Sequence, residues 1–234
     1  MSDVTNRWAD PGHALAYLGR ADGVPHRTEG EQVFLEVIPV DVRRVLDLGT
    51  GDGRLLALVR AARPRAMALG VDFSSTMLAA AAARFEGDTQ VALRQGDLED
   101  SLVDLDLGAF DAVVSSFAIH HLADARKRAL YGEVFEVLLP GGVFCNLEHV
   151  ASPSQRLHGE FLAALGETPE TEDPSNKLLD VGTQLGWLRE IGFEDVDCLW
   201  KWRELALLFG RKACAPLPPG RSERRSGRRR RPPA

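Results

Sequence analysis

The chain has 234 residues, of which 44% are hydrophobic, and a formal net charge of −6 at pH 7. This length and apolar share suit one globular α/β domain with a sizeable core. No apolar run approaches the roughly 18 residues of a membrane-spanning helix, and the first residues lack the basic and apolar regions of a secretory signal. The three cysteines, Cys145, Cys198 and Cys214, form no C-x-x-C pair, so we expect reduced thiols, a cytoplasmic protein and no membrane partner.

The charge is divided unevenly along the chain. Residues 211–234 hold nine Lys and Arg against one Glu, a net +8, which leaves −14 for residues 1–210. The Arg-, Pro- and Gly-rich residues 213–234 are typical of a disordered, solvated tail. The acidic body argues against nucleic-acid binding over the main surface, so only this basic tail offers a surface for RNA.

Strand and helix patterns alternate through the first 150 residues. Two short helices are expected before the first strand, at 11–20 and 27–38. Apolar runs of strand length follow at 43–49, 66–72, 89–97, 110–119 and 143–150. Helical spacing of apolar residues is seen at 52–62, 74–85 and 123–139. This alternation predicts an α/β fold with a doubly wound, mostly parallel sheet that is covered on both faces.

The pattern changes after residue 150. Helices are expected at 154–166 and 177–192, separated by a polar, acidic loop. Residues 194–212 contain two strands that meet near Lys201–Glu204, too close for anything but a hairpin, so the sheet is expected to end with an antiparallel strand.

These elements predict one domain and a tail. The domain covers residues 1–212, with residues 1–40 as a helical lid and residues 151–176 as an insert, and the tail covers residues 213–234.

The segment VLDLGTGDGR, residues 45–54, joins the first predicted strand to its helix. Three glycines spaced G-x-G-x-G let the backbone approach a ligand and leave helix N–H groups directed at it. Arg54 stands where the dinucleotide fingerprint G-x-G-x-x-G requires its third glycine, so an NAD site is not expected.

Aspartates lie at the ends of the first three predicted strands. Asp47, under the glycine loop, can receive a cationic group. Asp72 sits where an acid accepts both hydroxyls of a ribose, and Asp97 is placed to accept from an exocyclic amine such as that of adenine. The set describes a ligand with a cation, a ribose and an adenine but no pyrophosphate. The structural alternatives are a solvated strand end at Asp47 and helix caps at Asp72 and Asp97.

Five segments follow one another in a characteristic order over roughly residues 43–148: VLDLGTGDGR, GVDFSSTML, QGDLED, FDAVVSSFAIHHL and LLPGGVF. In this order and spacing they resemble the class I S-adenosylmethionine-dependent methyltransferases. The resemblance implies a seven-stranded sheet of order 3-2-1-4-5-7-6 with strand 7 antiparallel, S-adenosyl-L-methionine as the cofactor, and an enzyme that transfers its methyl group.

The resemblance also implies how the cofactor is held. The glycine loop would wrap the methionine part, Asp72 the ribose and Asp97 with Leu98 the adenine, against which Phe73 and Met77 would pack. Core packing is an equal alternative for Phe73 and Met77. The expected cofactor contacts are Asp47, Gly49, Thr50, Gly51, Gly53, Asp72, Phe73, Met77, Asp97, Leu98 and Ser115.

Two histidines directly after the fourth strand are the candidate catalytic residues. A base is needed only where the methyl acceptor must lose a proton. Successive side chains at a strand end point to opposite faces, so one of His120 and His121 is expected to reach the acceptor, with His120 favoured. The structural alternative is that an imidazole caps the helix that follows. No His-x₃-His or carboxylate pair supports a metal site.

A small organic molecule is the expected methyl acceptor. Trp8, Tyr17, Glu148 and His149 are the expected substrate contacts. The segment 187–212 is also similar to wobble-uridine tRNA methyltransferases, which keeps a tRNA substrate as an alternative. A third alternative, a cofactor-binding module without transfer chemistry, is disfavoured by the complete set of three aspartates.

Overall fold

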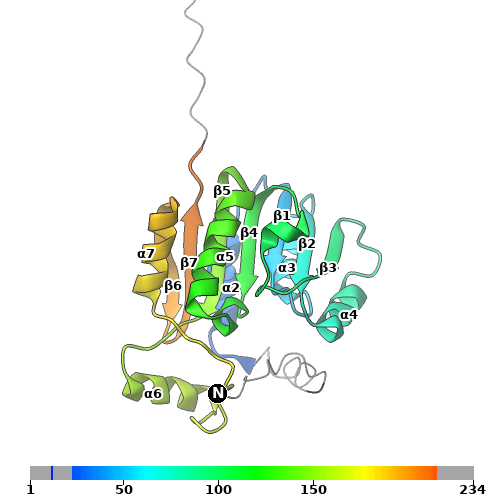
Figure 1. The fold of residues 1–234 in the computed structure, drawn as a ribbon. Helices are drawn as coiled ribbons and strands as arrows, with labels where there is room; N and C mark the ends of the chain where they lie inside the picture. Colours follow the sequence, from blue (N-terminus) through cyan, green and yellow to red (C-terminus); the bar gives the residue numbers. More distant parts are fainter. Residues whose placement is uncertain (1–11, 13–22, 215–234) are drawn as a thin grey trace, which may run out of the picture.

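The computed structural model describes Gly12 and residues 23–214. In this part of the chain, seven strands form one sheet in the order β3-β2-β1-β4-β5-β7-β6 (Figure 1). The strands are β1 (Arg44–Leu48), β2 (Met67–Asp72), β3 (Val91–Gln95), β4 (Phe110–Ser116), β5 (Leu138–His149), β6 (Glu194–Trp202) and β7 (Leu205–Arg211). β7 is antiparallel to β5 and β6, and all other neighbours are parallel. The predicted fold class, strand order and antiparallel last strand are confirmed.

Helices cover both faces of the sheet. α5 (Asp124–Val137) and α7 (Val181–Ile191) pack on one face, where Leu130 and Leu188 are fully buried. α2 (Arg27–Val37) and α3 (Arg54–Ala62) pack on the other face through Phe34 and Leu56. α4 (Ser75–Arg84) contacts β2 and β3. The helices thus bury both faces of the central strands, in agreement with the largely apolar sequences of β1 and β4.

The largest differences from the element boundaries that the sequence pattern predicts are at the starts of β5 and α7. β5 begins at Leu138, five residues before the predicted start at 143, because the chain is already paired with β4 there. The register against β4 shifts between Phe110 and Ala112. Gly141, within this part of β5, has a φ of +83°. Local apolar periodicity does not encode such a change of register. α7 begins at Val181, because the Asp180 side chain caps it by accepting from the N–H of Thr183 at 2.8 Å.

The segment after β5 lies beyond the carboxyl ends of the parallel strands (Figure 1). It contains α6 (Gln155–Leu165), whose Phe161 and Leu162 are buried against Leu205, with Trp200 and Trp202 packed alongside. The helix is therefore fixed to the β6–β7 hairpin. A short 3₁₀ helix, η3 (Leu102–Leu105), lies in the connection between β3 and β4.

Several sequence predictions concern other parts of the chain. The expected helix at 11–20, apart from Gly12, and the residues Trp8 and Tyr17 lie outside the described residues, as does the tail from residue 215. Within the described residues, no helix combines the length and the apolar character that crossing a bilayer requires.

Candidate active site

A pocket opens where β1, β2 and β4 end, between the glycine loop and the segment that follows β4. Open α/β sheets bind their ligands at this edge, outside the carboxyl ends of the strands. The structure brings ten of the predicted site residues into its wall: Asp47, Gly49, Thr50, Gly51, Asp72, Phe73, Met77, Asp97, Leu98 and His121. Residues that are far apart in sequence therefore share one cavity.

The glycine loop has a conformation that side chains disfavour. Gly49, Gly51 and Gly53 have φ values of +69°, +55° and +79°, in the left-handed region. A Cβ atom at Gly49 would lie 2.2 Å from the Cβ of Ala118. At Gly53, which precedes α3 and lies outside the pocket wall, a Cβ would lie 2.5 Å from the ring of Phe85. A side chain at Gly49 or Gly53 would therefore collide with its neighbour in addition to straining the backbone.

Asp47 is buried beneath this loop. Its Oδ2 accepts from the Thr50 hydroxyl at 2.7 Å, and within the described residues its Oδ1 has no hydrogen-bond partner. Burial raises the pKa of Asp47 to about 7, partly offset by the Thr50 hydrogen bond and reinforced by the charges of Asp72 and Asp52. The hydroxyl of Ser116, which also lines the pocket, is likewise buried and unpartnered there. Such unsatisfied atoms suit a ligand that carries a cation or a donor.

Asp72 and Asp97 both bind backbone N–H groups and still offer acceptor capacity. Asp72 accepts from Ser74 N and Gly51 N, each at 2.8 Å, and burial raises its pKa while these hydrogen bonds lower it in part. Asp97 is exposed and accepts from Glu99 N at 2.9 Å. Each carboxylate oxygen has two lone pairs, so these turn-forming contacts leave room for ligand hydroxyl and amine groups.

Two arginines in the pocket wall were not predicted from the sequence. Glu31 is 4% exposed and accepts from Arg27 Nε at 3.0 Å and from Arg54 Nε at 2.8 Å. In the sequence, Arg54 stands out only because it replaces the third glycine of the dinucleotide fingerprint. Its partner Glu31 lies on α2, 23 positions earlier in the chain, so no local pattern connects the two residues. These guanidinium groups can bind a carboxylate.

The two histidines occupy different places. They lie on the 3₁₀ turn η4 (Ile119–His121) with ring centroids 4.0 Å apart. His121 lines the pocket, whereas His120 is 6% exposed, outside the pocket wall, and its Nδ1 lies 2.6 Å from Oε1 of Glu148. Burial lowers the pKa of His120 well below its usual value and raises that of Glu148 to about 7. His120 is therefore a neutral imidazole paired with Glu148.

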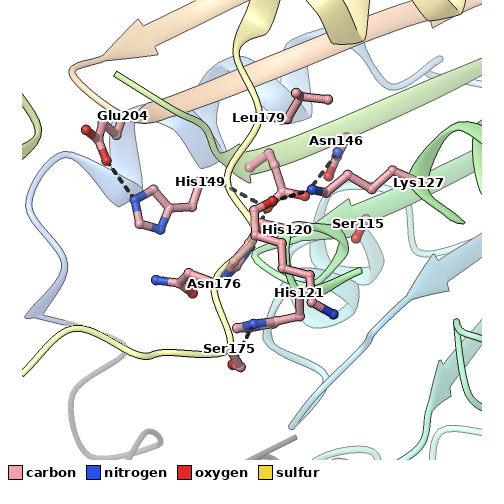
Figure 2. Close-up of polar contacts among 12 residues, drawn as sticks. Ser115, His120, His121, Lys127, Asn146, His149, Ser175, Asn176, Leu179 and Glu204 are labelled. Atoms are coloured by element: carbon pink, nitrogen blue, oxygen red, sulfur yellow. Dashed lines mark hydrogen bonds and ion pairs between the residues drawn. The ribbon is translucent and has the colours of Figure 1, made fainter. Parts of the chain in front are cut away.

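The other expected substrate contact, His149, also bonds within the protein. Its Nε2 lies 3.0 Å from Oε2 of the buried Glu204 (Figure 2). His158 lies 3.1 Å from both Glu204 and Glu172. Neither Glu148 nor His149 belongs to the described pocket wall.

Ser115, expected to contact the cofactor, is fully buried and donates to the carbonyl of Leu48 at 2.8 Å (Figure 2 shows its position). Its neighbour Ser116 lines the pocket instead. Among the described residues, no group of three or more His, Cys, Asp or Glu side chains is arranged to hold a metal ion.

Comparison with known proteins finds similarity to methyltransferases. A methyltransferase-domain model matches residues 45–142. The demethylmenaquinone methyltransferase of Thermus thermophilus is 35% identical over 151 residues, which cover 64% of this chain and 62% of that protein. The demethylmenaquinone methyltransferase of Roseiflexus castenholzii is 32% identical over 171 residues, 64% of this chain and 69% of that protein. The chain thus spans between six and seven tenths of the length of these two relatives.

Solved structures show the same fold at low sequence identity. An O-methyltransferase family protein from Burkholderia thailandensis has a TM-score of 0.71 and 20% identity, covering 89% of this chain and 62% of that one. Human N-acetylserotonin methyltransferase in complex with S-adenosylmethionine has a TM-score of 0.65 and 17% identity, covering 88% and 58%. Together with the strand order, the glycine loop and the Roseiflexus relative, these matches show that the chain belongs to the class I S-adenosylmethionine-dependent methyltransferases.

Proposed function

We propose that the chain transfers the methyl group of S-adenosylmethionine to a small organic acceptor. The observation that carries the proposal is one pocket that contains the glycine loop, the acids Asp47 and Asp72, and His121. Family membership supplies the reaction class.

The pocket residues fit the cofactor part by part. Asp47, with its unpartnered buried oxygen, would receive the positive charge of the methionine portion. Asp72 would accept the ribose hydroxyls, and Asp97 with Leu98 would hold the adenine. The guanidinium groups of Arg27 and Arg54 suit the methionine carboxylate. The bound cofactor supplies a methyl group activated by a sulfonium and open to in-line attack.

His121 is the proposed base where the acceptor must lose a proton. It stands in the pocket wall beside Leu122 and Phe117, whereas His120 lies behind it and is paired with Glu148. This geometry favours His121, whereas the sequence analysis favours His120. Burial, together with neighbouring His120, lowers the pKa of His121 to about 3, so its imidazole is neutral and retains a lone pair at physiological pH.

The proposed acceptor is a small molecule because the described pocket is a concave cleft and not a flat surface. The relatives named for demethylmenaquinone methylation act on a small molecule by their names. Cys145, Cys198 and Cys214 are free thiols, which supports placing the protein in a reducing compartment such as the cytoplasm.

Two measurements test this proposal. Calorimetry should detect binding of S-adenosylmethionine and of its demethylated product. It should detect no binding of NAD, because Arg54 replaces the third glycine of the dinucleotide fingerprint. Incubation of the protein with methyl-labelled cofactor and fractionated metabolite pools should then label a small product. NAD binding tighter than that of S-adenosylmethionine would refute the cofactor assignment, and label found only in macromolecules would refute the small acceptor.

A further inference from the structure

The segment between α6 and α7 passes directly over the two histidines. We call residues 172–180 the strap. Its Lys177 N–H donates to the carbonyl of His120 at 2.9 Å, and the buried Lys127 donates from α5 to the carbonyl of Lys177. In Figure 2 the strap residue Ser175 lies next to His121, with its Oγ 3.0 Å from Nδ1 of His121. The strap is thus attached to the turn that carries the proposed base.

The hydrogen bonds of Ser175 determine which nitrogen of His121 carries a proton. The Ser175 hydroxyl has one proton, and it donates to Oδ1 of Asp173 at 2.8 Å, since an ionised carboxylate only accepts. The Ser175 oxygen must then accept the contact from His121, so Nδ1 of His121 carries a proton. In the neutral imidazole this places the lone pair on Nε2.

We propose that Ser175 and Asp173 are positioning residues that hold the proton of His121 on Nδ1 and so keep Nε2 as the basic nitrogen. The proposal rests on the function proposed above. Ser175 is 8% exposed, and the Asp173 side chain also accepts from the Ser175 N–H at 2.9 Å. Both hydrogen bonds join Ser175 to Asp173 within the strap, so they orient these two side chains without a contribution from a ligand.

The same contacts serve the transfer step. The proton of the acceptor's O–H or N–H passes to Nε2 of His121, and the acceptor's electron pair forms the bond to the methyl carbon. The methyl–sulfur bond breaks and leaves its electron pair on sulfur. The imidazolium that forms donates from Nδ1 to Ser175, and the Asp173 carboxylate beyond it stabilises the new charge.

The charged groups around His121 agree with this role. Burial and His120 lower its pKa, while Asp173 on the strap and Glu148 on β5 raise it. His120 itself stays neutral because burial, His149 and Lys127 on α5 all lower its pKa. The carboxylate of Asp173 is therefore the neighbour best placed to stabilise a positive charge on His121.

The tautomer can be measured without knowing the acceptor. In protein labelled with ¹⁵N-histidine, NMR distinguishes a protonated ring nitrogen from an unprotonated one, and His121→Gln assigns the signal. In the unmodified protein we expect protonated Nδ1 and unprotonated Nε2. Ser175→Ala should move the Nε2 resonance toward the protonated range, whereas Ser175→Thr should restore the original tautomer. Asp173→Asn keeps the acceptor oxygen for the Ser175 N–H but removes the negative charge. It should therefore lower the pKa of His121, measured from the same ¹⁵N resonances over a series of pH values.

The outcomes separate this proposal from the proposed function. Two results would overturn the positioning role of Ser175 and Asp173, even if S-adenosylmethionine binds normally. One is a His121 that carries its proton on Nε2 in the unmodified protein, and the other is a Ser175→Ala spectrum identical to that of the unmodified protein. Failure to bind S-adenosylmethionine would instead refute the function and leave the tautomer result intact. Melting temperatures of the three strap variants identify any spectral change caused by unfolding, and the folded Ser175→Thr protein then decides.

Discussion

The N–H of Gly51 donates to Oδ2 of Asp72 at 2.8 Å, so the glycine loop after β1 is hydrogen-bonded to the acid that ends β2. Their strands are adjacent and parallel, with Leu48 paired to Val71. The acid expected to bind the ribose therefore also holds the loop expected to wrap the methionine part. Changes at Asp72 should affect both parts of the ligand site.

Asp72→Ala should weaken S-adenosylmethionine binding by roughly 2 kcal/mol or more, because it removes charge-assisted hydrogen bonds and releases the Gly51 N–H. Asp72→Asn should lose less, since its amide oxygen can accept from one of the two backbone N–H groups. Calorimetry gives the dissociation constants, with Glu86→Ala, an exposed acid after α4, as the control. Equal affinity in Asp72→Ala and the control would remove Asp72 from the site.

Gly49→Ala should destabilise the fold more than the same substitution at a left-handed glycine that has open space around it. The new Cβ would lie 2.2 Å from the Cβ of Ala118, which is fixed to the backbone. Gly87→Ala is the matched control, because Gly87 has a φ of +82° and a Cβ added there would meet no atom beyond its chain neighbours within 4 Å. Conformational strain alone should cost about 1–2 kcal/mol there.

Denaturant unfolding measures both variants, and Ala118→Gly added to Gly49→Ala should recover part of the loss by removing the contacting atom. If Gly49→Ala costs no more than Gly87→Ala, the close approach of the loop to Ala118 is not a constraint.

Local patterns predict the strands and ten residues that the structure brings into the pocket wall. The strands, the glycine loop and the three aspartates are signalled within single strand–turn–helix units, and the family order supplied the strand arrangement. The choice between the histidines was different. Alternation assumes a continuing strand, but Phe117 takes a φ of +52° and the chain then enters a 3₁₀ turn. The two side chains are therefore not on opposite faces of a strand, and the residue in the pocket wall is His121.

The other site contacts were not predictable because they join distant segments. Glu31 binds Arg54 across 23 positions, and Ser175 reaches His121 across 54. No periodicity or turn signal connects these pairs, since their approach depends on how α2 and the strap pack on the finished sheet.

Asp47 should make cofactor binding pH-dependent. In the ligand-free protein its pKa is raised to about 7, and a bound cation favours the ionised form. Affinity for S-adenosylmethionine should therefore fall as the pH drops below about 7, approaching tenfold per pH unit. Calorimetry between about pH 5.5 and 7 measures this. Asp47→Asn should bind weakly and without this slope, and a slope that persists in Asp47→Asn would assign it to another group.

Removal of residues 215–234 should leave folding and small-molecule methylation unchanged. The sheet is completed before this point, since Lys212 N donates to the carbonyl of Gly142 at 2.9 Å and Arg211 ends β7. The removed residues carry seven Arg and one Glu, so any salt-dependent RNA binding should disappear with them. Filter binding with tRNA compares the two proteins. Loss of small-molecule transfer on truncation would contradict the expectation.

His158 and Glu204 should stabilise the attachment of α6 within a defined pH window. Burial lowers the pKa of His158, but its contacts with Glu204 and Glu172 raise it overall. Burial raises the pKa of Glu204, but its bonds to His149, Ser152 and His158 lower it overall. The His158 contribution is complete below the ordinary value of 6.5 and is lost as the pH rises through the raised pKa. The Glu204 contribution is present above 4.5 and is lost as the pH falls through the lowered pKa.

Both contributions are therefore complete only between 4.5 and 6.5. His158→Gln keeps hydrogen-bonding groups and removes the charge, so it should cost roughly 0.5–1.5 kcal/mol of unfolding free energy near pH 6 and less near pH 8.5. Arg156→Gln is the control, because Arg156 on α6 pairs with Glu160 at a site where its side chain is 74% exposed and should contribute little at either pH. Denaturant unfolding at both pH values measures the difference. An equal loss at the two values would show that His158 stabilises α6 by packing alone, without its charge.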